Sequence, residues 1–231
     1  MRDRIYEDQL KTVPDFEFNE EVVSVFPDMI QRSVPGYATI LKGIGLMARH
    51  YLEEDDRCYD LGCSLGASSG AILSAVGDRK VRIEAVDAAP DMIRQAKLNI
   101  SDTRVNFHLS DICTIDLQPC QMVVLNLVLQ FIDPPERPSL VKKIFDCLQP
   151  GGILVVTEKI VSTPVHEQLH LEFKAMNGYS ELEIAQKRSA LEEVMKIEKL
   201  ESHINTLNQA GFRETDVWFR FLNWVSILAI K

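Results

Sequence analysis

Short apolar runs alternate with stretches of helical periodicity through the middle of the chain, from residue 57 to residue 159. The runs cover residues 58–62, 81–87, 105–111, 122–129 and 152–158. Strands that alternate with helices form right-handed βαβ units on a parallel sheet, and ligands bind at the carboxyl ends of such strands. The pattern therefore predicts a doubly wound α/β domain.

The segments on either side of this alternation have other patterns. Residues 22–37 and 39–52 carry apolar side chains at helical spacing, so we expect helices throughout residues 1–55, broken at Pro27 and Pro35. About forty residues after Thr163 predict further helices. The runs 212–221 and 223–231 predict an antiparallel pair of strands at the sheet edge.

We expect one domain over residues 1–231, built on a mostly parallel seven-stranded sheet with a C-terminal antiparallel hairpin. Its parts are an N-terminal helical cap (1–55), a cofactor-binding core (56–162), a helical insertion (163–210) and the terminal hairpin (211–231).

Composition narrows the class of protein. The chain has 231 residues, of which 46% are hydrophobic and 26% charged, as is usual for a soluble globular protein. The first residues lack the apolar stretch of a signal peptide, and no run approaches the roughly 20 apolar residues that span a bilayer, so we expect a cytoplasmic protein without membrane contact. The net charge of −9 disfavours extended contacts with nucleic acid.

The cysteines do not suggest a metal site. There are five, none in a C-x-x-C pair, and the five histidines are scattered along the chain. We expect no metal ion and reduced thiols, mostly in the core, at Cys58, Cys63, Cys113, Cys120 and Cys147.

A glycine turn follows the first predicted strand and opens a helix. Its small residues are Gly62, Ser64 and Gly66, preceded by Asp60. Small residues let the backbone approach a ligand, and the helix N-terminus offers free N–H groups. The spacing resembles the first motif of class I S-adenosylmethionine-dependent methyltransferases, with serine for the middle glycine. The alternative is a purely structural turn.

Further features follow in the order that this Rossmann-like fold requires. Asp87 ends the second predicted strand, where a carboxylate accepts ribose hydroxyls. Asp111 and the Ile112 backbone follow the third, where they would read an adenine edge, and residues 148–156 resemble the turn into the fifth strand of that family. Asn126 follows the fourth predicted strand. Its side chain would face the sulfonium or, alternatively, form hydrogen bonds with backbone groups of the loop. Each acidic residue alone is more often a helix cap or a solvated loop end, but together these features predict S-adenosyl-L-methionine as cofactor.

Longer segments narrow the resemblance within that superfamily. Residues 25–37, 60–67, 125–131, 177–195 and 217–231 closely resemble the carboxy-S-adenosyl-L-methionine synthase family, and the resemblance runs from Phe16 to Lys231. It implies conversion of S-adenosylmethionine and prephenate into carboxy-S-adenosylmethionine and phenylpyruvate, through a sulfonium ylide that captures carbon dioxide. The product would supply a tRNA carboxymethyltransferase that builds 5-oxyacetyluridine at the wobble position. The protein itself need not touch tRNA.

The resemblance also implies the site residues. Arg188 would bind the new carboxylate, which is the one catalytic role assigned, and would reach the site from the neighbouring subunit of a homodimer. An arginine offers a carboxylate a planar bidentate fork with a permanent charge. The alternative is a solvated helix residue paired with Glu192. Cofactor contacts fall on Tyr37, Gly62, Cys63, Ser64, Asp87, Ala88, Asp111, Ile112, Asn126 and Arg188.

Three positions depart from the family pattern. Ala88 stands where the family commonly has asparagine, Leu171 where it often has a second histidine, and Ala175 where it often has arginine. The departures leave open how prephenate is bound. The polar candidates, each equally plausible as a surface or interface residue, are Arg32, His170, Lys174 and Tyr179.

Two other classes of function stay open. An ordinary S-adenosylmethionine-dependent methyltransferase of a small molecule or tRNA would use the same scaffold without prephenate. A non-catalytic S-adenosylmethionine-binding subunit would bind the cofactor and turn nothing over.

Overall fold

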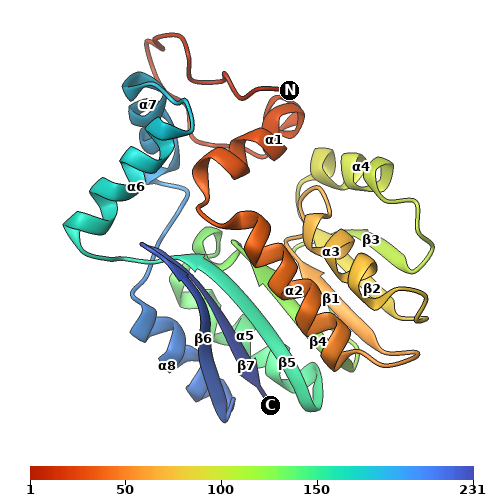
Figure 1. The fold of residues 1–231 in the computed structure, drawn as a ribbon. Helices are drawn as coiled ribbons and strands as arrows, with labels where there is room; N and C mark the ends of the chain where they lie inside the picture. Colours follow the sequence, from red (N-terminus) through yellow and green to blue (C-terminus); the bar gives the residue numbers. More distant parts are fainter.

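One central sheet of seven strands organises the computed structural model, which describes residues 1–231 (Figure 1). Its order is β3-β2-β1-β4-β5-β7-β6, in which the first five strands are parallel and β7 is antiparallel to both of its neighbours. The predicted doubly wound fold with a terminal hairpin is confirmed. The strands are β1 (Arg57–Leu61), β2 (Arg82–Asp87), β3 (Val105–Leu109), β4 (Cys120–Asn126), β5 (Leu148–Lys159), β6 (Glu214–Phe221) and β7 (Trp224–Ile230).

Helices cover both faces of this sheet. The helices are α1 (Glu20–Ser33), α2 (Tyr37–Tyr51), α3 (Ala67–Val76), α4 (Pro90–Asn99), α5 (Arg137–Cys147), α6 (Pro164–Met176), α7 (Glu181–Glu192) and α8 (Leu200–Ala210), with short 3-10 turns at Leu129–Phe131 and Pro134–Glu136. None of them combines the length and the apolar composition that a bilayer crossing would need.

Strand β4 shows why its sequence is a continuous apolar run. Met122 and Val124 point into the core shared with α2, α3 and α4, whereas Val123 and Leu125 point into the core shared with α5 and α8. Successive side chains of a strand face opposite sides of the sheet, and here both sides are buried. Alternation of apolar and polar residues is therefore lost at this position in the sheet.

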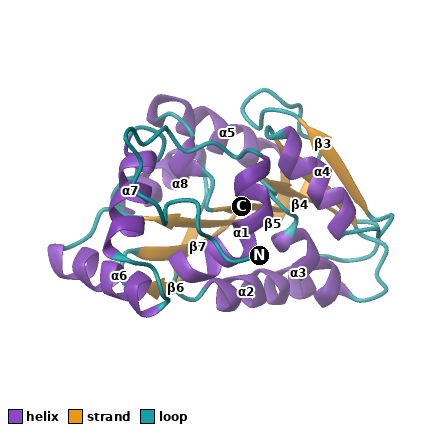
Figure 2. Cartoon of the chain, turned by 90° about the horizontal axis from the view of Figure 1, so that it is seen from above, coloured by secondary structure: helices purple, strands orange, loops and turns teal.

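A cap formed by α1, α6 and α7 stands above the carboxyl ends of the parallel strands, and an N-terminal strap, residues 1–19, crosses it (Figures 1 and 2). The prediction of helices throughout residues 1–55 is wrong for this strap, which contains no helix. It is also wrong at Pro27, which lies inside α1. Pro27 is exposed and costs one backbone hydrogen bond, while Val25 and Met29 on either side stay buried and keep the helix packed.

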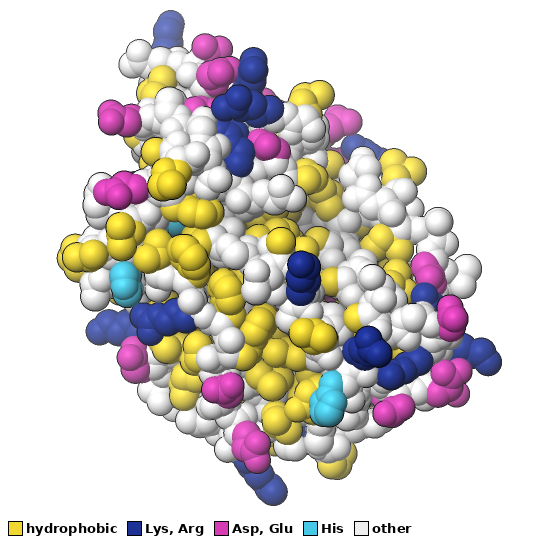
Figure 3. All heavy atoms as spheres, in the orientation of Figure 1, with side chains coloured by type: hydrophobic (Ala, Val, Ile, Leu, Met, Phe, Trp, Pro, Cys, Tyr) yellow, Lys and Arg dark blue, Asp and Glu magenta, His cyan; other side chains and the backbone are white.

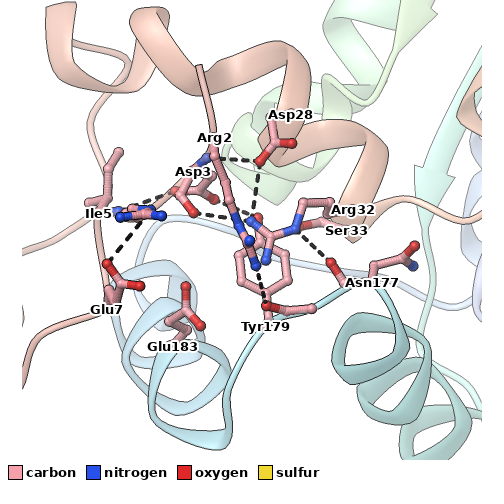
Figure 4. Close-up of polar contacts among 12 residues, drawn as sticks. Arg2, Asp3, Ile5, Glu7, Asp28, Arg32, Ser33, Asn177, Tyr179 and Glu183 are labelled. Carbon is pink, nitrogen blue, oxygen red and sulfur yellow. Dashed lines mark hydrogen bonds and ion pairs between the residues drawn. The ribbon is translucent and has the colours of Figure 1, made fainter.

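Charged groups buried inside the cap fasten the strap to it (Figure 4). Asp3 is only 1% exposed. Its carboxylate accepts a hydrogen bond from the Tyr179 hydroxyl and lies 3.6 Å from the Lys187 ammonium. Arg32 donates to the Asp3 carbonyl at 3.0 Å and to the Asn177 carbonyl at 2.8 Å. The network joins the strap, α1, the α6–α7 connection and α7.

The same network predicts the effect of removing one buried charge. Asp3→Asn leaves Lys187 buried without its counter-ion, so we expect the free energy of unfolding to fall by about 3 kcal/mol. Urea denaturation would measure this change. Asp8→Asn removes the same charge from an exposed position of the strap and serves as the control. Equal stability of the two variants would contradict the prediction.

Candidate functional site

A pocket of about 830 Å³ lies between the carboxyl ends of the parallel strands and the cap. Its lining follows the order of the sheet, from Asp87 at the end of β2, through Asn126 at the end of β4, to Trp224 at the start of β7. The volume is at the upper end of the range for sites that hold one small ligand. The pocket is therefore an elongated site that crosses most of the sheet.

The turn after β1 forms the floor of the pocket. Gly62 and Gly66 have φ angles of +75° and +83°, and Ser64 also has a positive φ, at +49°. A Cβ atom at Gly62 would lie 2.6 Å from Val128 Cγ2, so only glycine fits there. Gly66 makes no side-chain cap, so the N–H groups of Ala67 and Ser68 at the start of α3 are left for a ligand.

Two carboxylates, those of Asp60 and Asp87, hold this turn through hydrogen bonds. Asp60 is buried and accepts hydrogen bonds from the Ser69 N–H and hydroxyl, at 2.9 and 2.7 Å, which joins β1 to α3. Burial raises the pKa of Asp60 to about 6. Asp87 accepts from the backbone N–H of Ser64 at 2.8 Å and of Ala89 at 2.9 Å, and burial raises its pKa as well. Asp87 lines the pocket, whereas Asp60 does not.

The residues expected to contact the cofactor lie together. The side-chain amide of Asn126 donates to the Ser68 hydroxyl at 3.1 Å. Its side-chain oxygen, Oδ1, is buried without a hydrogen-bond partner and is an acceptor beside the pocket. Burial raises the pKa of Tyr37, so its hydroxyl stays neutral. Nine of the predicted residues line this one pocket: Tyr37, Gly62, Cys63, Ser64, Asp87, Ala88, Asp111, Ile112 and Asn126.

Arg188 lies apart from these nine residues. It is exposed on α7 and does not line the pocket of its own chain, whereas Lys187 and Leu191 on the same helix do.

The four polar candidates for a second substrate separate into two groups. His170 and Lys174 on α6 line the pocket, but Arg32 and Tyr179 belong to the buried network of the cap, where the Arg32 guanidinium stacks 3.7 Å from the centre of the Tyr179 ring. Leu171 and Ala175, at the departures from the family pattern, do not line the pocket.

Sequence reasoning missed three residues at the β7 end of the pocket: Lys159, Lys187 and Trp224. Lys159 directly follows the buried part of β5, a position where ligands of parallel sheets are expected, so that signal was available. Nothing in the sequence pattern distinguishes Lys187 from an ordinary helix lysine. Its ammonium pairs with Asp3, which is 184 positions away in the chain.

The loop after β4 forms one wall of the pocket, and one buried side chain binds three of its backbone N–H groups. Glu158 on β5 accepts hydrogen bonds from the backbone N–H groups of Val128, Leu129 and Gln130, at 3.0, 2.7 and 3.0 Å. Burial raises the pKa of Glu158 to about 8, although these three donors and Arg137 oppose the rise. Loop residues 127, 128 and 130–132 line the pocket, so Glu158 acts on the site through the backbone.

Comparison with known proteins identifies the family. A family model described as a methyltransferase domain matches residues 59–152. Carboxy-S-adenosyl-L-methionine synthases from Aeromonas salmonicida and Trichlorobacter lovleyi are each 46% identical to this chain, covering 100% and 99% of it and 97% and 98% of the relatives. The chain belongs to the carboxy-S-adenosyl-L-methionine synthase family. It is a transferase that uses S-adenosylmethionine, as the motifs predicted.

Solved structures at lower identity share the fold. Human N-acetylserotonin methyltransferase, in complex with SAM, superposes with a TM-score of 0.62 at 19% identity, covering 92% of this chain and 55% of that one. A phosphoethanolamine N-methyltransferase of Haemonchus contortus gives 0.68 at 15% identity, covering 94% and 60%. This synthase family therefore has the architecture of enzymes named as methyltransferases.

The Glu158 contacts predict a defect that spreads from β5 to the pocket. Above pH 8 Glu158 is ionised and both of its oxygens accept hydrogen bonds. Under these conditions Glu158→Gln replaces one acceptor oxygen by an amide N–H₂ that faces a backbone donor, so we expect a loss of about 2 kcal/mol in unfolding free energy. Weaker S-adenosylmethionine binding should accompany it, measured by calorimetry. Glu214→Gln, exposed at the start of β6, is the matched control. Unchanged stability in Glu158→Gln would show that these hydrogen bonds do not hold the loop.

Proposed function

We propose that this chain converts S-adenosylmethionine and prephenate into carboxy-S-adenosylmethionine and phenylpyruvate. Membership of the synthase family supports the proposal. The observation that carries it is the extent of the pocket, which continues past the nine predicted cofactor contacts to an end that bears lysines. A methyl donor alone does not need that second, cationic compartment, whereas a carboxylated co-substrate does.

The proposed reaction balances without an oxidant or a reductant. Prephenate loses its ring carboxylate as carbon dioxide and its ring hydroxyl as hydroxide, which leaves phenylpyruvate. The hydroxide takes a proton from the sulfonium methyl group and becomes water. The resulting ylide carbon attacks carbon dioxide, and the new carbon–carbon bond gives carboxy-S-adenosylmethionine. The part of the protein is to hold both reactants in line and exclude bulk water.

The nine lining residues suggest how the cofactor lies. The Asp87 carboxylate binds the ribose hydroxyls beside the turn, and Asp111 with the Ile112 N–H reads the adenine edge. The glycine turn and the start of α3 receive the methionine part, and the unpartnered Asn126 oxygen faces the sulfonium. This order puts the methyl group near β4, in the middle of the pocket.

The proposal includes a homodimer in which Arg188 serves the partner's site. An exposed apolar face runs over α2, α6 and β6 in the view of Figure 3 and supports association with a second copy. Large exposed hydrophobic side chains on these elements are Leu46 on α2, Val165, Leu169 and Met176 on α6, and Phe221 on β6. The position of Arg188 outside the pocket of its own chain supports a role in the site of a partner subunit.

Downstream, the product carries an activated carboxymethyl group and serves a tRNA carboxymethyltransferase in the cytoplasm. The net charge of −9 supports a division of labour in which the partner enzyme, and not this chain, binds tRNA.

Mass spectrometry tests the reaction directly. Purified protein with S-adenosylmethionine and prephenate should yield a species heavier than S-adenosylmethionine by one carbon dioxide, together with phenylpyruvate. The same protein without prephenate is the control and should leave S-adenosylmethionine unchanged. Unchanged S-adenosylmethionine in both samples, from folded and cofactor-bound protein, would overturn the proposal in favour of a methyltransferase or a silent binding subunit.

Arg188→Ala separates product recognition from cofactor recognition. We expect S-adenosylmethionine affinity to be preserved and carboxy-S-adenosylmethionine affinity to fall by about 10- to 100-fold, because a charge-assisted pair with the new carboxylate is lost. Calorimetry with both ligands measures the difference, and Arg213→Ala, at an exposed arginine before β6, is the control. Equal losses for both ligands, or a monomer by light scattering, would contradict this role.

A further inference from the structure

Three lysines from three different elements meet at the β7 end of the pocket. They are Lys159 at the end of β5, Lys174 on α6 and Lys187 on α7. Neighbouring strands are spaced by about 4.8 Å, so β7, two strands beyond β4, lies about 10 Å past the strand that ends in Asn126. This end of the pocket is therefore separate from the turn and carboxylates at the β1 and β2 end.

Two of these lysines have their charge compensated. Lys159 lies 3.3 Å from the Glu167 carboxylate. Lys187 lies 3.6 Å from the Asp3 carboxylate and donates to the Ser33 hydroxyl at 3.1 Å. Both contacts are built from the protein's own side chains, so neither ammonium is left for a ligand without breaking a pair.

Lys174 has no such partner. It takes part in none of the ion pairs or side-chain hydrogen bonds of the chain, although it is partly buried among other cations. Burial lowers its pKa to about 7, and the charges of Lys187, Lys159 and Arg188 act in the same direction, against Glu167. An ammonium in this position repels its neighbours and is stabilised only when an anion arrives.

His170, the remaining basic side chain at this end, does not compete for that anion. His170 Nε2 lies 2.9 Å from the Ser33 carbonyl and 3.2 Å from the Trp224 indole nitrogen. Burial lowers the pKa of His170 to about 3, so the ring is neutral at pH 7. The ring therefore offers no positive charge to a carboxylate.

We propose that Lys174 is the binding residue for a carboxylate of the second substrate, holding it at the β7 end of the pocket. The inference rests on the proposed function and adds a residue that the departures at Leu171 and Ala175 left unassigned. One anionic group of the substrate pairs with the Lys174 ammonium and relieves its repulsion from Lys159 and Lys187.

The test compares Lys174→Met, Lys174→Arg and the control Lys97→Met, which removes an exposed lysine of α4. Calorimetry of S-adenosylmethionine binding should give the same affinity for all four proteins, wild type included. The KM for prephenate in carboxy-S-adenosylmethionine formation should rise by about 10- to 100-fold in Lys174→Met and far less in Lys174→Arg. Lys97→Met should match the wild type.

A pH profile adds a readout that a merely structural role would not move. As pH rises through about 7, free Lys174 loses its proton, so the KM of the wild type for prephenate should increase. Lys174→Arg keeps its charge and should lose this dependence. The titratable groups near Lys174 come from three elements: Glu167 and His170 on its own helix, Lys159 on β5, and Lys187 and Arg188 on α7. Asp3 of the strap pairs with Lys187.

The outcomes separate this inference from the function it rests on. A wild-type KM in folded Lys174→Met, or an equal loss of S-adenosylmethionine affinity, overturns the role of Lys174 alone. Failure of the wild type to form carboxy-S-adenosylmethionine from prephenate overturns the proposed function, and this inference with it.

Discussion

The reversal of strand order between β1 and β4 is the constraint on which the site depends. β1 pairs with β2 on one side and with β4 on the other, so the connections that leave β1 and β4 run to opposite faces of the sheet and leave a crevice between them. The glycine turn, Asp87 and Asn126 all face this crevice because each follows or ends one of these strands. Without that reversal the same residues would not line one pocket.

The features that depend on local sequence patterns, namely the buried strands and the glycine turn, could be predicted from the sequence. Buried parallel strands require continuous apolar runs, and a turn without room for Cβ atoms requires glycine, so the core and the floor of the pocket were both readable. The strap was not, because residues 1–19 have no periodicity of their own and are held by partners far along the chain, such as Gln186 and Ala190. The helix break predicted at Pro27 is absent for a related reason, because the tertiary packing of α1 outweighs one lost hydrogen bond.

The residues of the site likewise fall into a group that could be predicted and a group that could not. Residues at the ends of strands could be placed from the order of elements alone, as with Asp111 and Asn126. Residues brought in by the cap could not, because the pocket-facing side of α6 and α7 depends on how those helices dock. His170 and Tyr179 looked equivalent in the sequence, yet one lines the pocket and the other is sealed within a network of buried charges.

That network also has a consequence for the order of events during synthesis. The strap is synthesised before the groups that hold it, because its hydrogen-bond partners on α7 and in the preceding connection lie 176 residues later. Contacts of such long sequence separation form late, because the intervening chain must be made and folded first. The nascent α/β core thus presents an open crevice, which becomes a covered pocket only after α7 has been synthesised and has docked against the strap.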